Sequence, residues 1–266
     1  MIPVISVELM RKSDAYTIET KISSKELMYL AGEAVFHKAK PEDNSVIVCG
    51  SGNNAGDGYV IALEMAKAGL NSTLLLLGEK FSEDGLYYFE KCKEQKIPFI
   101  YADENTDFSK YSNIIDCIFG TGFKGEPGGI TSDIIDKINS SGKRVISVDI
   151  NSGLNGDSGM YKKCVKSNLT VSIGYLKTGF FLGDAHRVIA KLSNVDIGID
   201  LCQKPFYLAE KEEELPSEYS YADFTPLKNP AEELASVAKG EFIRWQNIVT
   251  NGNDTYILNK GDYYGN

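Results

Sequence analysis

The 266-residue sequence predicts an α/β fold with a mostly parallel β-sheet. Two observations support this prediction. Apolar runs of strand length alternate along the chain with longer segments of helical periodicity. The apolar runs are also continuous, which is typical of parallel strands that helices cover on both faces and that right-handed crossovers connect.

The predicted elements follow one another in a regular order. After an amphipathic opening segment, residues 23–39 form a helix, because Ser23 and Glu26 make a capping box ahead of apolar residues at helical spacing. Strands are predicted at residues 45–50, 71–78, 97–101, 112–120, 143–150 and 169–173. Helices are predicted at residues 58–69, 82–95 and 129–142, and residues 188–199 close the unit.

The character of the sequence changes near residue 201. A charge run and several prolines follow, which is typical of a linker or an extended surface segment. Two short β-like runs then flank Asn251 and Gly252, which predicts a hairpin. We therefore expect one domain over residues 1–200 and a linker with a short C-terminal extension over residues 201–266.

The composition favours a small-molecule ligand. A formal charge of −9 disfavours nucleic acid or an anionic membrane as the main partner. No apolar run approaches the roughly 20 residues of a membrane helix, and the N-terminus lacks a secretory apolar region, so we expect a cytoplasmic protein. The five cysteines have no CxxC spacing, which argues against disulfides and zinc, and Cys49 and Cys117 are expected in the core.

Three loops hold the unusual residues. They are GSGNNAGDG (50–58), DCIFGTGFKGEPGG (116–129) and VDINSGLNGDSG (148–159), and each follows a predicted strand. In a doubly wound sheet ligands bind beyond the carboxyl ends of the strands. We therefore expect these loops to converge, although they are distant in sequence.

The first loop allows two interpretations. Residues 50–55 satisfy the dinucleotide pattern G-x-G-x-x-G/A, and Glu79 stands where a ribose-binding acid would be expected. Asp57 argues against this, because a carboxylate near the helix start would compete with a pyrophosphate. Turn formation and helix capping are the alternative explanation for Asn53, Asn54 and Asp57.

The three loops also offer a set of oxygen donors. Asn54, Asp116 and Ser152 supply oxygen atoms with a single formal charge, which suits a hard cation of low charge such as an alkali ion. The two histidines, His37 and His186, lie outside these loops, so histidine chemistry is disfavoured.

Two residues are candidates for the chemistry. Asp149 ends a buried strand, where burial and a nearby cation can tune a carboxyl group for proton transfer; its alternative role is to cap a helix or brace a loop. Lys177 lies between a strand and a glycine-flanked apolar turn. It is either a solvated surface lysine or a residue that faces the site.

Taken together, these motifs resemble the NAD(P)H-hydrate epimerase family. The resemblance runs from about residue 8 to 200 and rests on the joint pattern of the segments ELMYLAG, CGSGNNAGDG, DCIFGTGFKGEPGG, SVDINSGLNGDSG, GYLKTGFFLG and NVDIGI. It implies a Rossmann-like three-layer α/β/α sandwich. It also implies equilibration of the R and S forms of hydrated NADH and NADPH (NADHX and NADPHX), so that a separate S-specific dehydratase can restore the cofactor.

The resemblance also implies residue roles. It assigns K⁺ to Asn54, Asp116 and Ser152, and acid–base work to Asp149, with Lys177 as the second candidate catalytic residue. The implied substrate contacts are Asn53, Asn54, Ala55, Gly56, Asp57, Gly120, Thr121, Gly122, Phe123, Lys124, Gly125, Glu126 and Asp149. A homodimer is expected.

Some features depart from the family pattern. Ala55 stands in place of a usual glycine, Asn151 in place of a proline and Asn155 in place of an aspartate, and Asn151 is expected to loosen the turn that presents Ser152. The tail faintly resembles part of the dehydratase, and we expect no dehydratase activity. The alternative functions are a non-catalytic nucleotide-binding dimerisation module and an NAD-dependent oxidoreductase.

Overall fold

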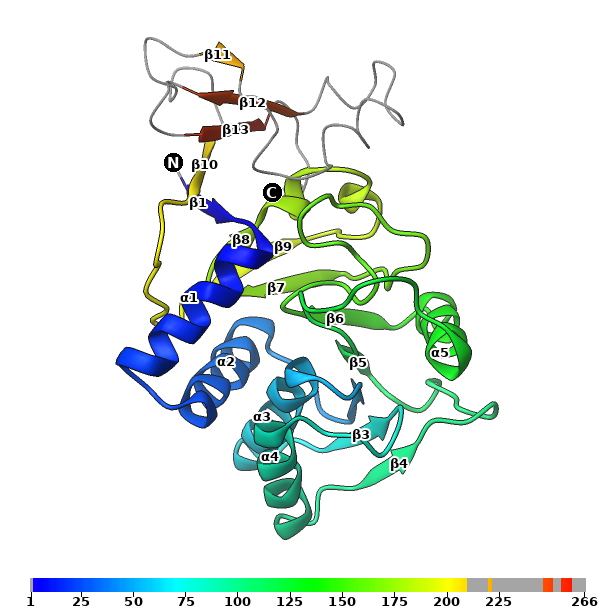
Figure 1. Ribbon diagram of the computed structural model, residues 1–266. Helices are drawn as coiled ribbons and strands as arrows, with labels where there is room; N and C mark the ends of the chain where they lie inside the picture. Colours follow the sequence, from blue (N-terminus) through cyan, green and yellow to red (C-terminus); the bar gives the residue numbers. More distant parts are fainter. Residues whose placement is uncertain (1, 210–219, 222–245, 251–254, 260–266) are drawn as a thin grey trace.

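The computed structural model describes residues 2–209, 220–221, 246–250 and 255–259 (Figure 1). A seven-stranded sheet lies at its centre, with the strand order β4-β3-β2-β5-β6-β7-β9 and only parallel neighbours. Its strands are β2 (Ser45–Cys49), β3 (Ser72–Leu76), β4 (Phe99–Tyr101), β5 (Asn113–Cys117), β6 (Arg144–Val148), β7 (Leu169–Ile173) and β9 (Leu192–Val195). This confirms the predicted parallel α/β fold.

Helices cover both faces of this sheet and make it the middle of three layers (Figure 1). Helix α5 (Gly129–Ser140) covers one face. The other face carries α1 (Val7–Thr20), α2 (Ser24–Ala39), α3 (Asn53–Lys67) and α4 (Glu83–Glu94). The predicted cap of α2 is present, because the Ser23 side chain accepts a hydrogen bond from the Glu26 N–H at 3.2 Å.

The core is divided between the two faces because successive strand residues point in opposite directions. In β2, Ile47 and Cys49 pack toward α2 and α3, whereas Val46 and Val48 pack toward α5. Cys49 and Cys117 are both fully buried, as predicted. Strand β4 differs from the others: as the edge strand it leaves Phe99, Ile100 and Tyr101 between 39% and 49% exposed.

A second sheet joins the two ends of the described chain, in the order β11-β12-β13-β10-β1-β8. Its strands are β1 (Ile2–Ile5), β8 (Leu176–Lys177), β10 (Phe206–Ala209), β11 (Ser220–Tyr221), β12 (Gln246–Thr250) and β13 (Thr255–Asn259). Strands β12 and β13 pair antiparallel over five residues, as the predicted hairpin requires. Its turn, residues 251–254, lies outside the described residues.

Strand β1 holds this second sheet together. It pairs parallel with β8, where Ile5 lies opposite Lys177, and antiparallel with β10. The short 3₁₀ segments η1 (Thr178–Phe181) and η2 (Ala185–Arg187) follow β8. Among the helices that the structure describes, none has the length and apolar character that crossing a bilayer would require.

Candidate active site

The three glycine-rich loops meet at the carboxyl edge of the central sheet. Gly120, in the loop after β5, marks the meeting point: a Cβ built there would lie 3.3 Å from Asn54 Cβ and 3.3 Å from Asp149 Oδ2. The Asn54 side-chain amide donates to the Phe119 carbonyl at 2.9 Å, and the Thr121 N–H donates to Asp149 Oδ2 at 3.3 Å. One loop therefore contacts the other two.

Asp116 and Ser152 form the buried base of this junction, and neither is exposed to solvent. Asp116 Oδ1 accepts from the Ser152 hydroxyl at 2.5 Å and from the Ile118 N–H at 3.3 Å. Asp116 Oδ2 accepts from the Ser147 hydroxyl at 2.8 Å and from the Ser152 N–H at 3.0 Å. Burial raises the pKa of Asp116, and these hydrogen bonds offset part of the rise.

Asn151 tightens the turn that presents Ser152, contrary to the expectation from the sequence. Its fully buried amide nitrogen donates to the Val165 carbonyl at 2.8 Å, to the Val188 carbonyl at 3.0 Å and to the Ser167 hydroxyl at 3.0 Å. Its oxygen accepts from the Thr170 hydroxyl at 2.5 Å. The side chain thus replaces the rigidity of a proline with four hydrogen bonds.

The other two departures are also accommodated. Ala55 is 2% exposed and packs in the core. The side-chain oxygen Oδ1 of Asn155 accepts from the backbone N–H groups of Asp157 and Ser158, at 3.0 and 2.8 Å. Neither residue disturbs the path of its loop.

Asp149 and Lys177 form a buried ion pair at the junction. Lys177 is 0% exposed, and its ammonium donates to Asp149 Oδ1 at 2.5 Å, to the Ser172 hydroxyl at 3.0 Å and to the Ile173 carbonyl at 2.8 Å. The interpretation of Lys177 as a solvated lysine was therefore wrong. Asp149 retains 16% exposure, so its carboxylate is the solvent-facing half of the pair.

The backbone of Asp149 is strained. Its φ of 65° lies in the left-handed region, which costs a non-glycine residue roughly 1 to 3 kcal/mol. This conformation follows the end of β6 directly and turns the carboxylate toward Lys177 and Thr121. Such strain is often found where a side chain must be held in one place for function.

The loop after β2 leaves some of its polar side-chain atoms without partners. Helix α3 begins after Gly52 with no side-chain capping bond, so capping does not explain these side chains. Asn54 is 5% exposed, and its Oδ1 has no hydrogen-bond partner. Within the described residues the Asp57 carboxyl group accepts no hydrogen bond, while Asn53 is exposed. Burial, together with Asp149 and Asp14, raises the pKa of Asp57 well above its usual range.

Asp14 belongs to this cluster, and sequence reasoning missed it. It lies on α1, 135 positions before Asp149, and carries no motif. Burial and the charge of Asp149 raise the pKa of Asp14 to about 7, and Lys177 opposes this rise. The available signal was a carboxylate next to the buried residue Ser13 on an amphipathic helix.

The remainder of the loop after β5 extends outward from the cluster. Phe123 stacks on Phe119, with ring centroids 3.8 Å apart. Gly122, Lys124, Gly125 and Glu126 are exposed, and Glu126 pairs with Lys162 rather than with a residue of the cluster. The structure therefore places Gly120 and Thr121 beside Asp149, and the following residues at an exposed rim.

The oxygen donors converge as their sequence positions predicted. The Asn54 amide nitrogen donates to the Phe119 carbonyl, the Phe119 N–H donates to the Ser152 hydroxyl, and that hydroxyl donates to Asp116. Asn54 Oδ1 has no partner. Among the described residues there is no cluster of three histidine, cysteine or acidic side chains arranged to hold a metal. Any ion at this junction would therefore be held mainly by neutral oxygen atoms.

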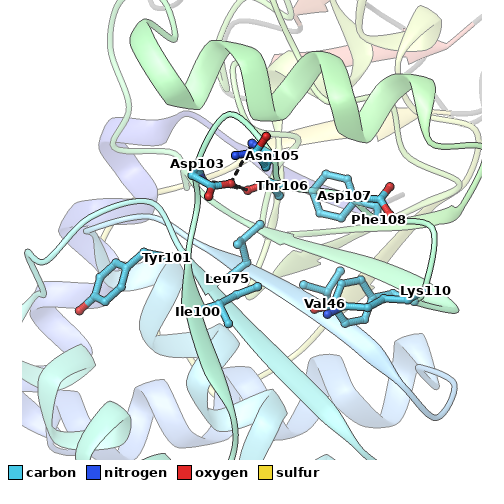
Figure 2. Close-up of a pocket in the computed structure, with 11 residues that line it drawn as sticks. Val46, Leu75, Ile100, Tyr101, Asp103, Asn105, Thr106, Asp107, Phe108 and Lys110 are labelled. Atoms are coloured by element: carbon cyan, nitrogen blue, oxygen red, sulfur yellow. Dashed lines mark hydrogen bonds between the residues drawn. The ribbon is translucent and has the colours of Figure 1, made fainter.

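A separate hollow lies on the α5 side of the sheet, between β4 and residues 103–111, with a volume of about 340 Å³ (Figure 2). None of its lining residues belongs to the three loops. Its polar groups largely satisfy one another, since Asp103 Oδ1 accepts from the Asn105 N–H at 2.9 Å and from the Thr106 hydroxyl at 3.2 Å. One lining group, the buried Tyr111 hydroxyl, has no hydrogen-bond partner, and within the described chain no lining residue forms an ion pair like that of Asp149 and Lys177.

Comparisons with known proteins agree with this arrangement. A family model described as YjeF-related protein N-terminus matches residues 24–179. The NAD(P)H-hydrate epimerase of Lentilactobacillus buchneri is 35% identical over 208 residues, which cover 75% of this chain and 96% of that protein. A bifunctional NAD(P)H-hydrate repair enzyme of Coxiella burnetii is 34% identical over 189 residues, which cover 68% of this chain but 38% of that protein.

The fold also has a counterpart among solved structures. The crystal structure of a yeast protein aligns with a TM-score of 0.64 and covers 77% of this chain and 96% of that one. At 20% identity this likeness shows the fold alone.

Proposed function

The chain belongs to the YjeF-related family that includes the NAD(P)H-hydrate epimerases, and on this premise we propose that it interconverts the R and S forms of hydrated NADH and NADPH. It is an isomerase acting on a small molecule. The observation that carries this function is the Asp149–Lys177 ion pair at the junction of three loops, in a chain 35% identical to an epimerase over most of its length.

The reaction requires a proton donor and a proton acceptor. The substrate carries a hydroxyl group on a ring carbon next to the ring nitrogen. The C–O bond breaks as the hydroxyl takes up a proton and leaves as water, and the nitrogen lone pair stabilises the resulting cation. Water then adds to the opposite face and gives up a proton. No oxidant or reductant is consumed.

Asp149 is our proposed proton acceptor. Its carboxylate is fixed by Lys177 and by the Thr121 N–H, yet it still reaches solvent. Lys177 has three acceptors and no exposure, so its role is to orient Asp149 and balance its charge rather than to contact the substrate. Burial raises the pKa of Asp57 well above its usual range, which favours the carboxyl form that can donate a hydrogen bond to the ligand.

We also propose that the junction binds K⁺. The partnerless Asn54 Oδ1 supports this assignment, because a buried amide oxygen without a hydrogen bond is costly unless it meets a ligand. The ion would be held by Asn54, Asp116, Ser152 and the Phe119 carbonyl. A cation of low charge such as K⁺ is suited to a set of mainly neutral oxygen donors. When bound, K⁺ supplies positive charge that fixes the loops and attracts the polar part of the substrate.

Several coarser features complete the proposal. We expect a cytoplasmic homodimer. We also expect it to work with a separate dehydratase, since relatives such as the Coxiella burnetii protein are named bifunctional repair enzymes. We expect no dehydratase activity from this chain itself. Conversion of S-NADHX to NADH by the pure protein with ATP or ADP would contradict that expectation.

The function is tested with R-NADHX and an S-specific dehydratase from another source. Adding the purified chain should restore all the NADH absorbance quickly. With the dehydratase alone, the rate of NADH recovery should be limited by spontaneous epimerisation. A rate no higher than the spontaneous one would reject the epimerase and favour the non-catalytic binding module. Reduction of a substrate by NADH, without action on the hydrate, would favour the oxidoreductase.

A further inference from the structure

The start of helix α1 is fixed to the active site. Strand β1 places Ile5 opposite Lys177, and the helix begins two residues later. The Val7 N–H then donates to Asp157 Oδ1 at 2.7 Å, and Asp157 lies in the loop that follows Asp149. Helix α1 therefore leaves the site from a defined point.

The next turns of α1 pass close to the partners of Lys177. Met10 packs against Gly174, where its Cε would lie 3.0 Å from an added Cβ. Gly174 directly follows Ile173, whose carbonyl accepts from the Lys177 ammonium at 2.8 Å. Asp14 is one turn beyond Met10, and residues four apart in a helix share a face. Asp14 therefore lies on the side of α1 that faces the site.

Two hydrogen bonds fix the rotation of α1 about its axis. The Cys202 N–H donates to the Ser13 hydroxyl at 3.3 Å, and the Asp200 N–H donates to the Thr17 hydroxyl at 2.9 Å. Asp200 itself pairs with Lys21 at the far end of the helix, away from Asp14. The position of Asp14 is thus set on both sides, by Met10 and by Ser13.

Four titratable groups from different elements lie near one another. Asp14 comes from α1, Asp57 from α3, Asp149 from the end of β6 and Lys177 from β8. The charges of Asp149 and Lys177 act on the pKa of Asp14, and those of Asp149, Asp14 and Lys177 act on the pKa of Asp57. Within the described chain no hydrogen bond joins any two of the three carboxyl groups, and each remains partly exposed. The three carboxyl groups therefore lie near one another without being paired to each other.

We propose that Asp14 is the second proton-transfer residue of this site and works in the direction opposite to Asp149. This role rests on the proposed epimerase function. The Asp14 carboxyl donates its proton to the leaving hydroxyl as the C–O bond breaks, and the Asp149 carboxylate accepts a proton from the water that forms the new C–O bond. Both carboxyl groups then exchange protons with solvent, and the opposite epimer uses them in reverse.

The protonation behaviour of Asp14 suits this role. Its pKa of about 7 means that donor and acceptor forms coexist at neutral pH, which is favourable for acid–base catalysis. Burial, together with the charges of Asp149 and Asp14, also raises the pKa of Asp57 well above its usual range. Asp14 is therefore the carboxyl group that should define the alkaline limb of the pH–rate profile.

The test compares the full wild-type chain with Asp14→Asn, Asp14→Glu and, as a control on the exposed side of the same helix, Glu19→Gln. Initial rates of NADHX epimerisation are measured between pH 5.5 and 9. Asp14→Asn should lower kcat by about 100-fold, the scale typical of a lost acid–base group, with KM changed by less than about threefold. The pH–rate profile of Asp14→Asn should lose the alkaline limb near pH 7. Asp14→Glu should recover part of kcat. Glu19→Gln should match wild type.

The outcomes separate this role from the proposed function. An active wild type together with an Asp14→Asn variant of unchanged kcat and pH profile overturns the role of Asp14 alone. A wild type that never exceeds the spontaneous rate overturns the epimerase function and this role with it. Carboxyl ¹³C NMR titration of the wild type gives a measurement without turnover, with Asp14→Asn used for assignment. Titration of Asp14 near its ordinary value of 3.8 would overturn the proposal.

Discussion

The loop after β2 and the loop after β6 lie at the same edge of the sheet, but they satisfy their polar groups in opposite ways. After β6, the buried amide of Asn151 makes four hydrogen bonds and Ser152 bonds to Asp116 through both its N–H and its hydroxyl. After β2, Asn54 Oδ1 has no partner, and the carboxyl group of Asp57 accepts no hydrogen bond from any described residue.

This difference separates scaffold from ligand surface. A folded protein rarely leaves buried polar groups unpaired, because each one costs about 1 to 3 kcal/mol. The loop after β6 therefore maintains the fold, whereas the loop after β2 has groups to offer to a ligand. Within the loop after β6, Asp149 is the residue whose carboxylate is fixed yet still reaches solvent, and the Ser152 hydroxyl combines its role in the fold with the proposed ion site.

The largest effect is expected at Asp149. Asp149→Asn should lower kcat about 1,000-fold, because it removes the proposed proton acceptor while an amide oxygen can still accept from Lys177. The coupled NADHX assay gives the rate, and circular dichroism verifies the fold. Asp184→Asn, at a surface pair with Arg187, is the matched control and should keep the wild-type rate. More than a tenth of wild-type activity in Asp149→Asn would remove Asp149 from its role.

The scaffold half of the comparison is tested at Asn151. Asn151→Ala should lower the free energy of unfolding by about 2 to 4 kcal/mol, because it leaves two buried carbonyls and two hydroxyls with fewer partners. Urea titration measures the change. Asn53→Ala, at an exposed position of the other loop, should change it by less than about 0.5 kcal/mol. Equal stabilities of the two variants would contradict the assignment of this loop as scaffold.

The ligand half is tested at Asn54. Asn54→Ala should lower activity about tenfold and raise the K⁺ concentration needed for half-maximal rate, because one proposed ligand and its link to Phe119 are lost. Titration with KCl at constant ionic strength, with choline chloride as the balancing salt, measures both. If the rate and the thermal stability of the wild type do not change with the K⁺ concentration, the cation site is excluded.

The smallest expected effect concerns stability and pH. Because the folded pKa of Asp14, about 7, exceeds its ordinary value of 3.8, the folded state binds more protons than the unfolded state between these values. The free energy of unfolding therefore falls as pH rises through this interval. Asp14→Asn should match wild type near pH 4 and exceed it at pH 8 by on the order of 2 kcal/mol, about half of what the full pKa shift would give, because the carboxyl group is partly exposed to solvent. Thermal melts at both pH values, with Glu19→Gln beside them, test this.

The sequence predicted what depends on local patterns. Apolar runs such as those of β2 and β5 identified the parallel sheet, and the parallel sheet brought Asn54, Asp116 and Ser152 to one edge. Capping was an unsuccessful explanation for Asn54, because its side chain reaches across to Phe119. The pairing of Lys177 with Asp149 was open, since a lone lysine shows its burial only once the strands are assembled.

Features that depend on long-range contacts were out of reach of sequence reasoning. Asp14 becomes part of the site only because β1 pairs with β8 and sets the path of α1. The second sheet combines strands of two to five residues from both ends of the described chain, and such short segments have little periodicity. Asn151 was expected to loosen its turn because it replaces a proline. The four partners that tighten the turn lie 14 to 37 positions away, so the sequence did not reveal them.

The pairing of β1 with both β8 and β10 has a consequence for synthesis in the cell. Strand β1 leaves the ribosome well before both of its neighbours, because β8 follows some 170 residues later and β10 begins at residue 206. Most strands of the central sheet, from β2 to β7, are therefore synthesised while β1 still lacks its partners. The sheet edge beside Lys177 can be completed only after these strands have been made.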